Sequence, residues 1–247
     1  MHSPVKQFTI EVLYELSLFG FDISFTNSAL FMVLAVIVST LFLAVAMRPA
    51  AVVPGRLQSA AEMMYEFVAD MVRSNVGSEG RPYFPFIFTL FVFVLFSNLL
   101  GMLPYSYTTT SQIIVTFAMA SFIFVAVTLI GLIKHGLHFF SFFVPAGAPK
   151  PLYPLIILIE VVSYFVRPVS LSVRLFANML AGHTMLKVFA GLAVMMAGAG
   201  GVTAAGSLLP LLAIIGLTGL EFLVAALQAY VFTILTCMYL NDALHLH

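Results

Sequence analysis

Long runs without a charged side chain limit what this chain can fold into. The first covers residues 29–47, and two more cover residues 82–104 and 113–133. As α-helices they rise about 1.5 Å per residue, so each is about long enough to cross a hydrocarbon core of roughly 30 Å. The whole chain is 62% hydrophobic and only 8% charged, whereas soluble domains carry roughly 25% charged residues. The sequence therefore predicts an all-α integral membrane protein, with these runs as its first three spans.

Two longer apolar segments follow, at residues 151–192 and 207–240. As single helices they would extend roughly 63 Å and 51 Å. Such lengths fit a hydrocarbon core of roughly 30 Å only if the helix breaks or tilts well beyond the usual value of about 20°. Pro168 is a candidate kink. We expect the two segments to form a steeply tilted hairpin, which makes about five membrane-crossing helices in one membrane domain over residues 1–247.

Residues 56–75 have the pattern of an amphipathic surface helix. Apolar side chains recur there at helical spacing, while the opposite face carries three acids, Glu62, Glu66 and Asp70. An acidic stripe is not attracted to anionic lipid headgroups, so electrostatics does not hold this helix on a membrane. Two explanations stay open, a contact with a partner protein and a solvated face.

The distribution of basic residues predicts the orientation, because cytoplasmic loops collect lysine and arginine. The segment between the first two spans carries four arginines, Arg48, Arg56, Arg73 and Arg81. Residues 134–150 are basic again, whereas the loops at 105–112 and 197–206 are uncharged. We therefore expect residues 1–28 to be an outer amino-terminal segment and the carboxyl terminus to lie inside.

A polar stripe runs along the segment 151–192. Its members are separated by three, four, three, four and four residues, so they share one helix face: Glu160, Ser163, Arg167, Ser170, Arg174 and Asn178. Ionisable side chains in a membrane cost roughly 2.5 to 3.5 kcal/mol each and usually serve a function. The stripe is interpreted as an ion pathway. A row of interhelical hydrogen bonds is the alternative, and Glu160 and Arg167 could also reach the interface by snorkelling.

Arg174 is about midway along this segment. A guanidinium keeps its proton at any accessible pH, so Arg174 does not relay protons itself. A permanent positive charge there can hold a nearby carboxylate ionised and can block a cation from leaking through. The alternative is a static ion pair with Glu160 or Glu221.

His183 and Glu221 form a second candidate site. An antiparallel hairpin would bring them level, and Gln228 shares the helix face of Glu221. Their reference pKa values, near 6.5 and 4.3, suit proton transfer, although a lone buried histidine can also be structural.

Two ligands are too few for a metal site. GAGG at 198–201 lacks the lysine and hydroxyl residue of a phosphate loop, and ten basic residues balance ten acidic ones, so no cofactor, metal or nucleic acid is predicted.

Two segments carry a resemblance to a known family. SLSVRLFANMLAGH (170–183) and LEFLVAALQAYVFTILTCMYL (220–240) resemble subunit a of the F-type ATP synthase, the stationary proton channel beside the rotating c-ring. PLYPLIILIEVVSYFVRPVS and SNLLGMLP are similar to other segments of that family, and the order of the five spans agrees over nearly the whole chain. His183 and Glu221 stand in the order of mitochondrial and alphaproteobacterial members; other bacterial members carry the acid first.

The resemblance implies a role for each polar residue. Arg174 would separate two half-channels and face the c-ring carboxylate, with Asn178 and Gln228 beside it. The outer half-channel would contain His183, Glu221 and Asn98, and the inner one Glu160 and Ser163.

The resemblance also implies partners and a location. The chain would not be an enzyme itself and would contact the c-ring, peripheral stalk b-type subunits and lipid. A bacterial inner membrane is expected, with a mitochondrial inner membrane as the alternative. Two rival readings of the polar residues stay open: a self-contained proton-coupled transporter and a scaffold that transports nothing.

Overall fold

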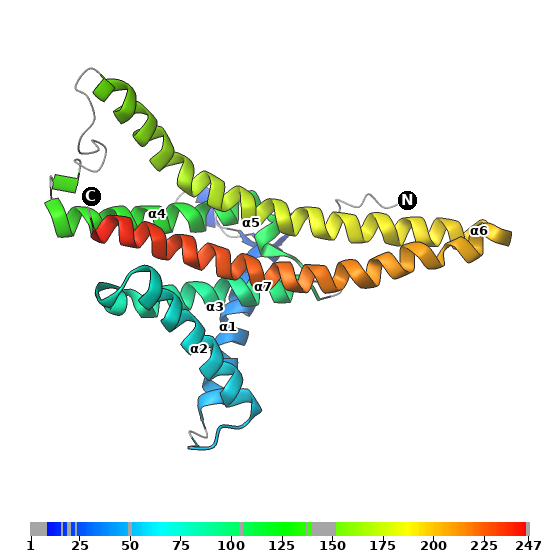
Figure 1. Ribbon diagram of the computed structural model, residues 1–247. Coiled ribbons are helices and arrows are strands. Elements are labelled where there is room, and N and C mark those ends of the chain that lie inside the picture. The colour runs from blue at the N-terminus through cyan, green and yellow to red at the C-terminus, as the bar shows by residue number, and fades with distance from the viewer. Residues whose placement is uncertain are drawn as a thin grey trace. The chain divides into compact units, whose positions relative to one another are not determined.

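A computed structural model describes residues 9–15, 17–18, 21–22, 24–48, 51–103, 106–136, 138–139 and 152–245. Within these ranges, five helices are long and apolar enough to cross a membrane, and the prediction of an all-α membrane protein is confirmed (Figure 1). Parts of four sequence predictions fall outside the described residues. Two of them are residues 1–8 of the amino-terminal segment and the predicted end of the second span at Pro104. The others are most of the basic loop, up to the predicted helix start at Pro151, and the last two residues of the carboxyl terminus.

The helices follow the hydrophobic pattern closely. Their bounds are α1 Asn27–Met47, α2 Arg56–Asn75, α3 Phe84–Gly101, α4 Ile113–His135, α5 Tyr153–Gly198, α6 Gly201–Gly206 and α7 Leu208–Leu244, with 3-10 turns η2 Ser78–Tyr83 before α3 and η3 Thr109–Ser111 before α4. The amphipathic helix occupies the residues expected for it. The great length of α5 and α7 is confirmed, and α5 continues past Pro168. Their tilt stays a prediction.

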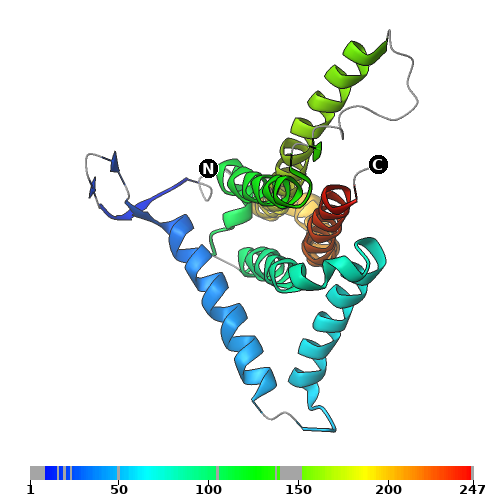
Figure 2. The ribbon, with the colours of Figure 1, turned by 90° about the vertical axis from the view of Figure 1, so that its left-hand side faces the viewer.

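Two features differ from the sequence expectation. Residues 12–26 contain four short strands, β1 Val12–Tyr14, β2 Ser17–Leu18, β3 Phe21–Asp22 and β4 Phe25–Thr26, with β1 antiparallel to β4 and β2 antiparallel to β3, just before α1 (Figure 2). The expected loop at 197–206 is largely helical: α5 ends at Gly198 and α6 begins at Gly201. Gly200 and Gly201 have positive φ values of 71° and 60°, a conformation that glycine adopts freely. They make the turn between the two helices.

The chain divides into two compact units. Unit 1 comprises residues 1–40, 93–112 and 175–229, and unit 2 comprises residues 41–92, 113–174 and 230–247. In unit 2, α2 packs through aromatic rings: Tyr65 meets Phe84 with ring centroids 4.8 Å apart, and Phe67 lies 5.7 Å from Tyr230. Its acids Glu66 and Asp70 stay exposed. The apolar face of α2 is therefore used for packing within this chain.

Unit 2 is also joined by polar contacts between helices. Thr116 of α4 and Ser172 of α5 are buried and share a hydrogen bond of 3.1 Å. Arg167 of α5 forms an ion pair of 2.8 Å with Asp242 of α7. Interhelical polar contacts of this kind fix the register of packed membrane helices.

Candidate functional site

Unit 1 contains an open cavity of about 880 Å³ whose wall combines polar and apolar side chains. Its wall comes from the amino-terminal segment, α1, the loop after α3, α5 and α7. The lining residues with polar or ionisable side chains are Thr9, Glu11, Asn27, Ser106, Tyr107, His183, Lys187 and Glu221. Water can occupy this cavity, because the polar side chains in its wall can form hydrogen bonds with it.

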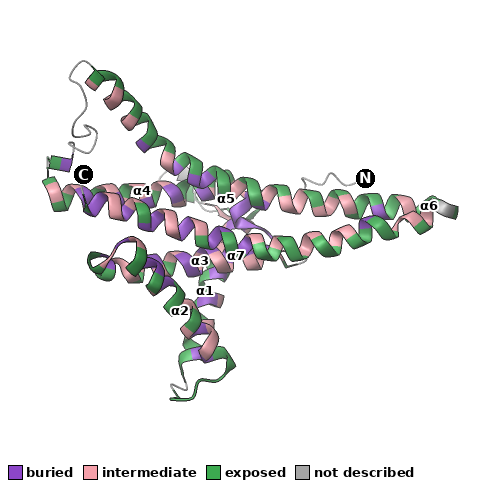
Figure 3. Cartoon of the chain, in the orientation of Figure 1, coloured by how far each residue is buried: buried purple, intermediate pink, exposed green. Residues whose placement is uncertain are grey.

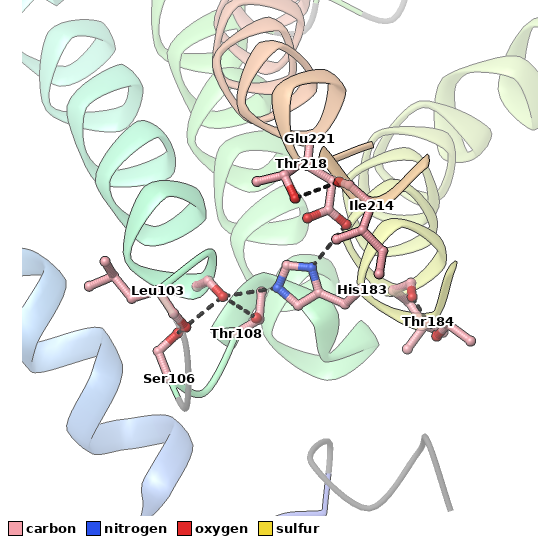
Figure 4. Close-up of polar contacts among 10 residues, drawn as sticks. Leu103, Ser106, Thr108, His183, Thr184, Ile214, Thr218 and Glu221 are labelled. Carbon is pink, nitrogen blue, oxygen red and sulfur yellow. Dashed lines mark hydrogen bonds and ion pairs between the residues drawn. The ribbon is translucent and has the colours of Figure 1, made fainter. Parts of the chain in front are cut away.

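His183 and Glu221 meet at this cavity. His183 Nδ1 lies 3.3 Å from Glu221 Oε1, and only 11% and 13% of the two side-chain surfaces are exposed. Figure 4 shows the imidazole of α5 pointing between the carboxylate of α7 and the chain that follows α3. The expectation that an antiparallel hairpin brings these two residues together is confirmed.

The second ring nitrogen determines how His183 can act. His183 Nε2 lies 2.9 Å from the Gly101 carbonyl oxygen. A carbonyl only accepts hydrogen bonds, so Nε2 must carry a hydrogen and donate it. In neutral His183 the lone pair is then on Nδ1, the atom that faces Glu221. Proton exchange within the pair therefore runs between Nδ1 and the Glu221 carboxylate.

The Gly101 carbonyl is available because α3 ends there. The last carbonyls of a helix have no partner within the helix, and this one accepts hydrogen bonds from Ser106 Oγ and Thr108 Oγ1, both at 3.0 Å, besides His183 (Figure 4). A Cβ at Gly101 would lie 2.7 Å from Thr108 Cγ2. Only glycine therefore allows the following loop to close over the helix end. Sequence reasoning missed this acceptor, since a backbone carbonyl leaves no signal in a motif.

Asn98 and Gln228 are the most deeply buried of the predicted site residues. Asn98 is fully buried in α3, and its Nδ2 donates to the Ala225 carbonyl of α7 at 3.2 Å. Its Oδ1 is buried without a protein hydrogen-bond partner, which costs free energy unless water serves it. Gln228 is 5% exposed. Both amides lie inside unit 1.

The polar stripe of α5 lies mostly on the surface of this chain. Ser163, Ser170, Arg174 and Asn178 are exposed, while Glu160 is half-buried. Exposed residues occur along the whole of α5 (Figure 3). The Arg174 guanidinium forms no hydrogen bond or ion pair with any described residue of unit 2, Glu160 included.

Arg167 is the exception in the stripe. Besides its ion pair with Asp242, its guanidinium lies 5.5 Å from the ring centre of Tyr164 and 5.2 Å from that of Tyr239. For this residue the alternative interpretation, a contact between helices, describes the geometry. Asp242 lies on α7, which continues to Leu244, beyond the end of the apolar segment predicted at residue 240.

Among the described residues, no three histidine, cysteine or acidic side chains come close enough to hold a metal ion. The cavity and the His183–Glu221 pair together define the class of the protein: a multi-pass helical membrane protein whose spanning helices hold ionisable groups beside a polar space.

Comparison with known proteins specifies the family. The family model described as ATP synthase A chain matches residues 29–241. The chain is 58% identical to ATP synthase subunit a of Rhodospirillum rubrum over the full length of both chains. It is 56% identical to ATP synthase subunit a of Parvibaculum lavamentivorans, over 98% of this chain and 93% of that one, and 54% identical to that of Rhizobium rhizogenes, over 99% and 98%. The chain belongs to the ATP synthase A chain family.

Proposed function

We propose that this chain is the stationary proton-translocating subunit of an F-type ATP synthase and takes no part in nucleotide chemistry. It offers two offset half-channels to the carboxylates of a rotating c-ring, and Arg174 prevents leakage between them. Membership of the ATP synthase A chain family supports the general role.

The exposure of Arg174 is the observation that carries this proposal. A guanidinium inside a membrane costs several kcal/mol unless it is paired or reaches water, yet Arg174 and Asn178 lie on a face of α5 that this chain leaves uncovered. A partner with acidic groups at membrane depth would satisfy Arg174. The c-ring provides such a partner, since each of its carboxylates passes this face in turn.

The cavity of unit 1 supplies the outer half-channel. A proton from the outer side reaches Glu221 and His183, passes between Oε1 and Nδ1, and neutralises a c-ring carboxylate. The neutral carboxyl group can enter lipid, where an ionised one could not. Asn98, whose Oδ1 is buried and unpaired, borders this route, and Gln228 is given a role in the same proton translocation.

The inner half-channel completes the cycle. After nearly a full turn of the ring, the carboxyl group meets Glu160 and Ser163 and releases its proton to the inner side. Arg174 then holds the ionised carboxylate, because an opposite charge favours the charged form. Each charge that crosses at 100 mV releases about 2.3 kcal/mol, so several protons together drive the soluble catalytic head.

The same proposal covers location and other contacts. The orientation expected from the basic loops puts the amino terminus outside and the carboxyl terminus inside a bacterial inner membrane. The exposed acids of α2, Glu66 and Asp70, are offered to a peripheral stalk b-type subunit. Positive side chains on that subunit would suit them.

Purification of the chain from its native membrane tests the proposal against its rivals. We expect a ring of small two-helix subunits to copurify with it, and the isolated chain in liposomes to conduct no protons. A lone chain that transports protons would support a self-contained carrier. A complex that conducts protons equally well without the chain would make it a scaffold.

Gly182 offers a test of the His183–Glu221 contact. A Cβ at Gly182 would overlap the Glu221 carboxylate, so Gly182→Ala should push Oε1 away from His183 while α5 persists, because alanine favours helix by about 0.8 to 1.0 kcal/mol over glycine. We expect ATP-driven proton pumping to fall roughly tenfold or more, as a displacement of about 1 Å can cost this much.

Gly191→Ala is the matched control for this variant. Gly191 lies on the same helix, and a Cβ there would meet no atom within 4 Å. Its pumping should equal that of the parent. Equal pumping by the two alanine variants would argue against the importance of the close approach at Gly182.

A further inference from the structure

The amino-terminal segment forms part of the wall of the cavity that holds His183 and Glu221. Thr9 and Glu11 line this cavity together with Asn27 at the start of α1. Hydrophobic patterning gives no reason for these residues to lie there, since the segment precedes the first span. Glu11 is exposed, so it borders both the cavity and the solvent.

Asn27 holds this segment with both ends of its amide. Its Nδ2 donates to the Thr9 carbonyl at 3.2 Å, and its Oδ1 accepts from the backbone N–H groups of Glu11 at 3.3 Å and Ser28 at 2.8 Å. The Asn27 backbone N–H also donates to the Glu11 carbonyl at 3.0 Å. The antiparallel pairing of β1 with β4 continues the attachment. Hydrogen bonds from Asn27 thus hold the backbone of Glu11 and of Thr9, whereas the Glu11 side chain is exposed.

Glu11 differs in exposure from the other acidic group of the cavity. The titratable or charged groups that face this space are Glu11 from the amino-terminal segment, Tyr107 from the loop after α3, His183 and Lys187 from α5, and Glu221 from α7. Burial raises the pKa of the Tyr107 phenol above its ordinary value, so Tyr107 stays neutral in the working range of pH. Lys187 is a base and not an acid, so it cannot add a negative charge to the cavity. Glu11 is the exposed carboxylate of this set.

We propose that Glu11 is the proton-collecting carboxylate of the outer half-channel and that Asn27 is the positioning residue that keeps it at the cavity. This inference rests on the proposed function. An exposed carboxylate attracts protons from the surrounding water and delivers them into the cavity toward Glu221. By Coulomb's law, one negative charge changes the concentration of a univalent cation about threefold at roughly 7 Å in water. Salt screens this effect over about 10 Å at 0.1 M and about 30 Å at 0.01 M.

Glu11→Gln removes the charge with little change in shape. The assay is ATP synthesis by the whole complex in proteoliposomes, oriented so that the outer face of this chain meets the interior, whose pH and salt are set during loading. We expect a rate about threefold below the parent at an interior pH near 8 and about 0.01 M salt, where proton supply limits the reaction. The deficit should shrink at lower pH and disappear near 0.3 M salt. Glu11→Asp should keep the parent rate.

Glu15→Gln is the matched control, since Glu15 is an exposed acid of the same segment that does not line the cavity. Its rate should stay near that of the parent. Asn27→Ala should reproduce the salt-sensitive deficit of Glu11→Gln. When the two substitutions are combined, the deficit should be no more sensitive to salt than that of Glu11→Gln alone. A purely structural role of Asn27 would lower the rate equally at both salt concentrations.

Three outcomes would overturn the inference: Glu11→Gln at the parent rate, equal losses in the Glu11 and Glu15 variants, or a Glu11→Gln loss that does not respond to salt. All three leave the proposed function intact, because the parent complex still couples proton flow to synthesis. Synthesis that proceeds without this chain would refute the proposed function itself.

Discussion

Arg174→Ala is expected to abolish ATP-driven proton pumping and respiration-driven ATP synthesis in membrane vesicles while the complex still assembles. The side chain is exposed on α5 and makes no hydrogen bond or ion pair with the described residues of its unit, so its removal leaves no such bond broken there and should not unfold the chain. A c-ring carboxylate would, however, lose the cation that holds it ionised. Breaking a charge pair in a low-dielectric setting costs about 3 to 5 kcal/mol, which corresponds to roughly a 150-fold to 5000-fold loss of coupled flux.

Arg174→Lys is the control for charge. It retains a cation but loses the planar fork with five donors, so we expect pumping between that of the parent and that of the alanine variant. Under the proposed mechanism the alanine variant should also leak protons passively, because no fixed charge would then separate the half-channels. Normal coupling in Arg174→Ala, with assembly verified by copurification of the c-ring, would refute the proposed mechanism.

Glu221→Gln is expected to lower proton flow roughly 100-fold. Proton transfer by a positioned side chain typically contributes about 10² to 10⁴ in rate, and an amide cannot exchange a proton with His183 Nδ1, which lies 3.3 Å from Oε1 in the parent. The amide has the same shape as the carboxylate, so α7 should keep its packing. ATP synthesis in proteoliposomes, driven by an imposed potential and pH gradient, measures the loss.

Exchanging the two residues separates chemistry from position. His183→Glu alone puts two carboxylates side by side, and like charges at this distance shift their pKa values apart and impair transfer. Adding Glu221→His restores one imidazole and one carboxyl group across the same gap. We expect the double variant to recover at least tenfold over His183→Glu alone. A double variant no better than the single one would mean that the Gly101 carbonyl, which fixes the tautomer of His183, requires the histidine on α5.

Much of the architecture could be predicted because it depends on local properties. A run such as residues 113–133 must be helical wherever it meets lipid, since only a helix satisfies its own backbone hydrogen bonds there. The structure gives α4 as Ile113–His135 and α2 as Arg56–Asn75, within two residues of the pattern. The meeting of His183 with Glu221 was also predictable, because two long segments joined by a short connection must run antiparallel. The loop at 197–206 was predicted incorrectly, as its glycines and alanines suit a short helix as well as a turn.

The sequence by itself determined the five apolar helices, the amphipathic α2, the stripe of polar residues on α5 and the pairing of His183 with Glu221, because hydrophobic length and helical period act over a few turns. Only the tertiary structure decided that Arg167 pairs with Asp242, that the Gly101 carbonyl sets the tautomer of His183, and that Asn27 holds Glu11 at the cavity. These contacts join residues between 16 and 82 positions apart. No local pattern records them, because they depend on which helix ends and loops meet once the chain has packed.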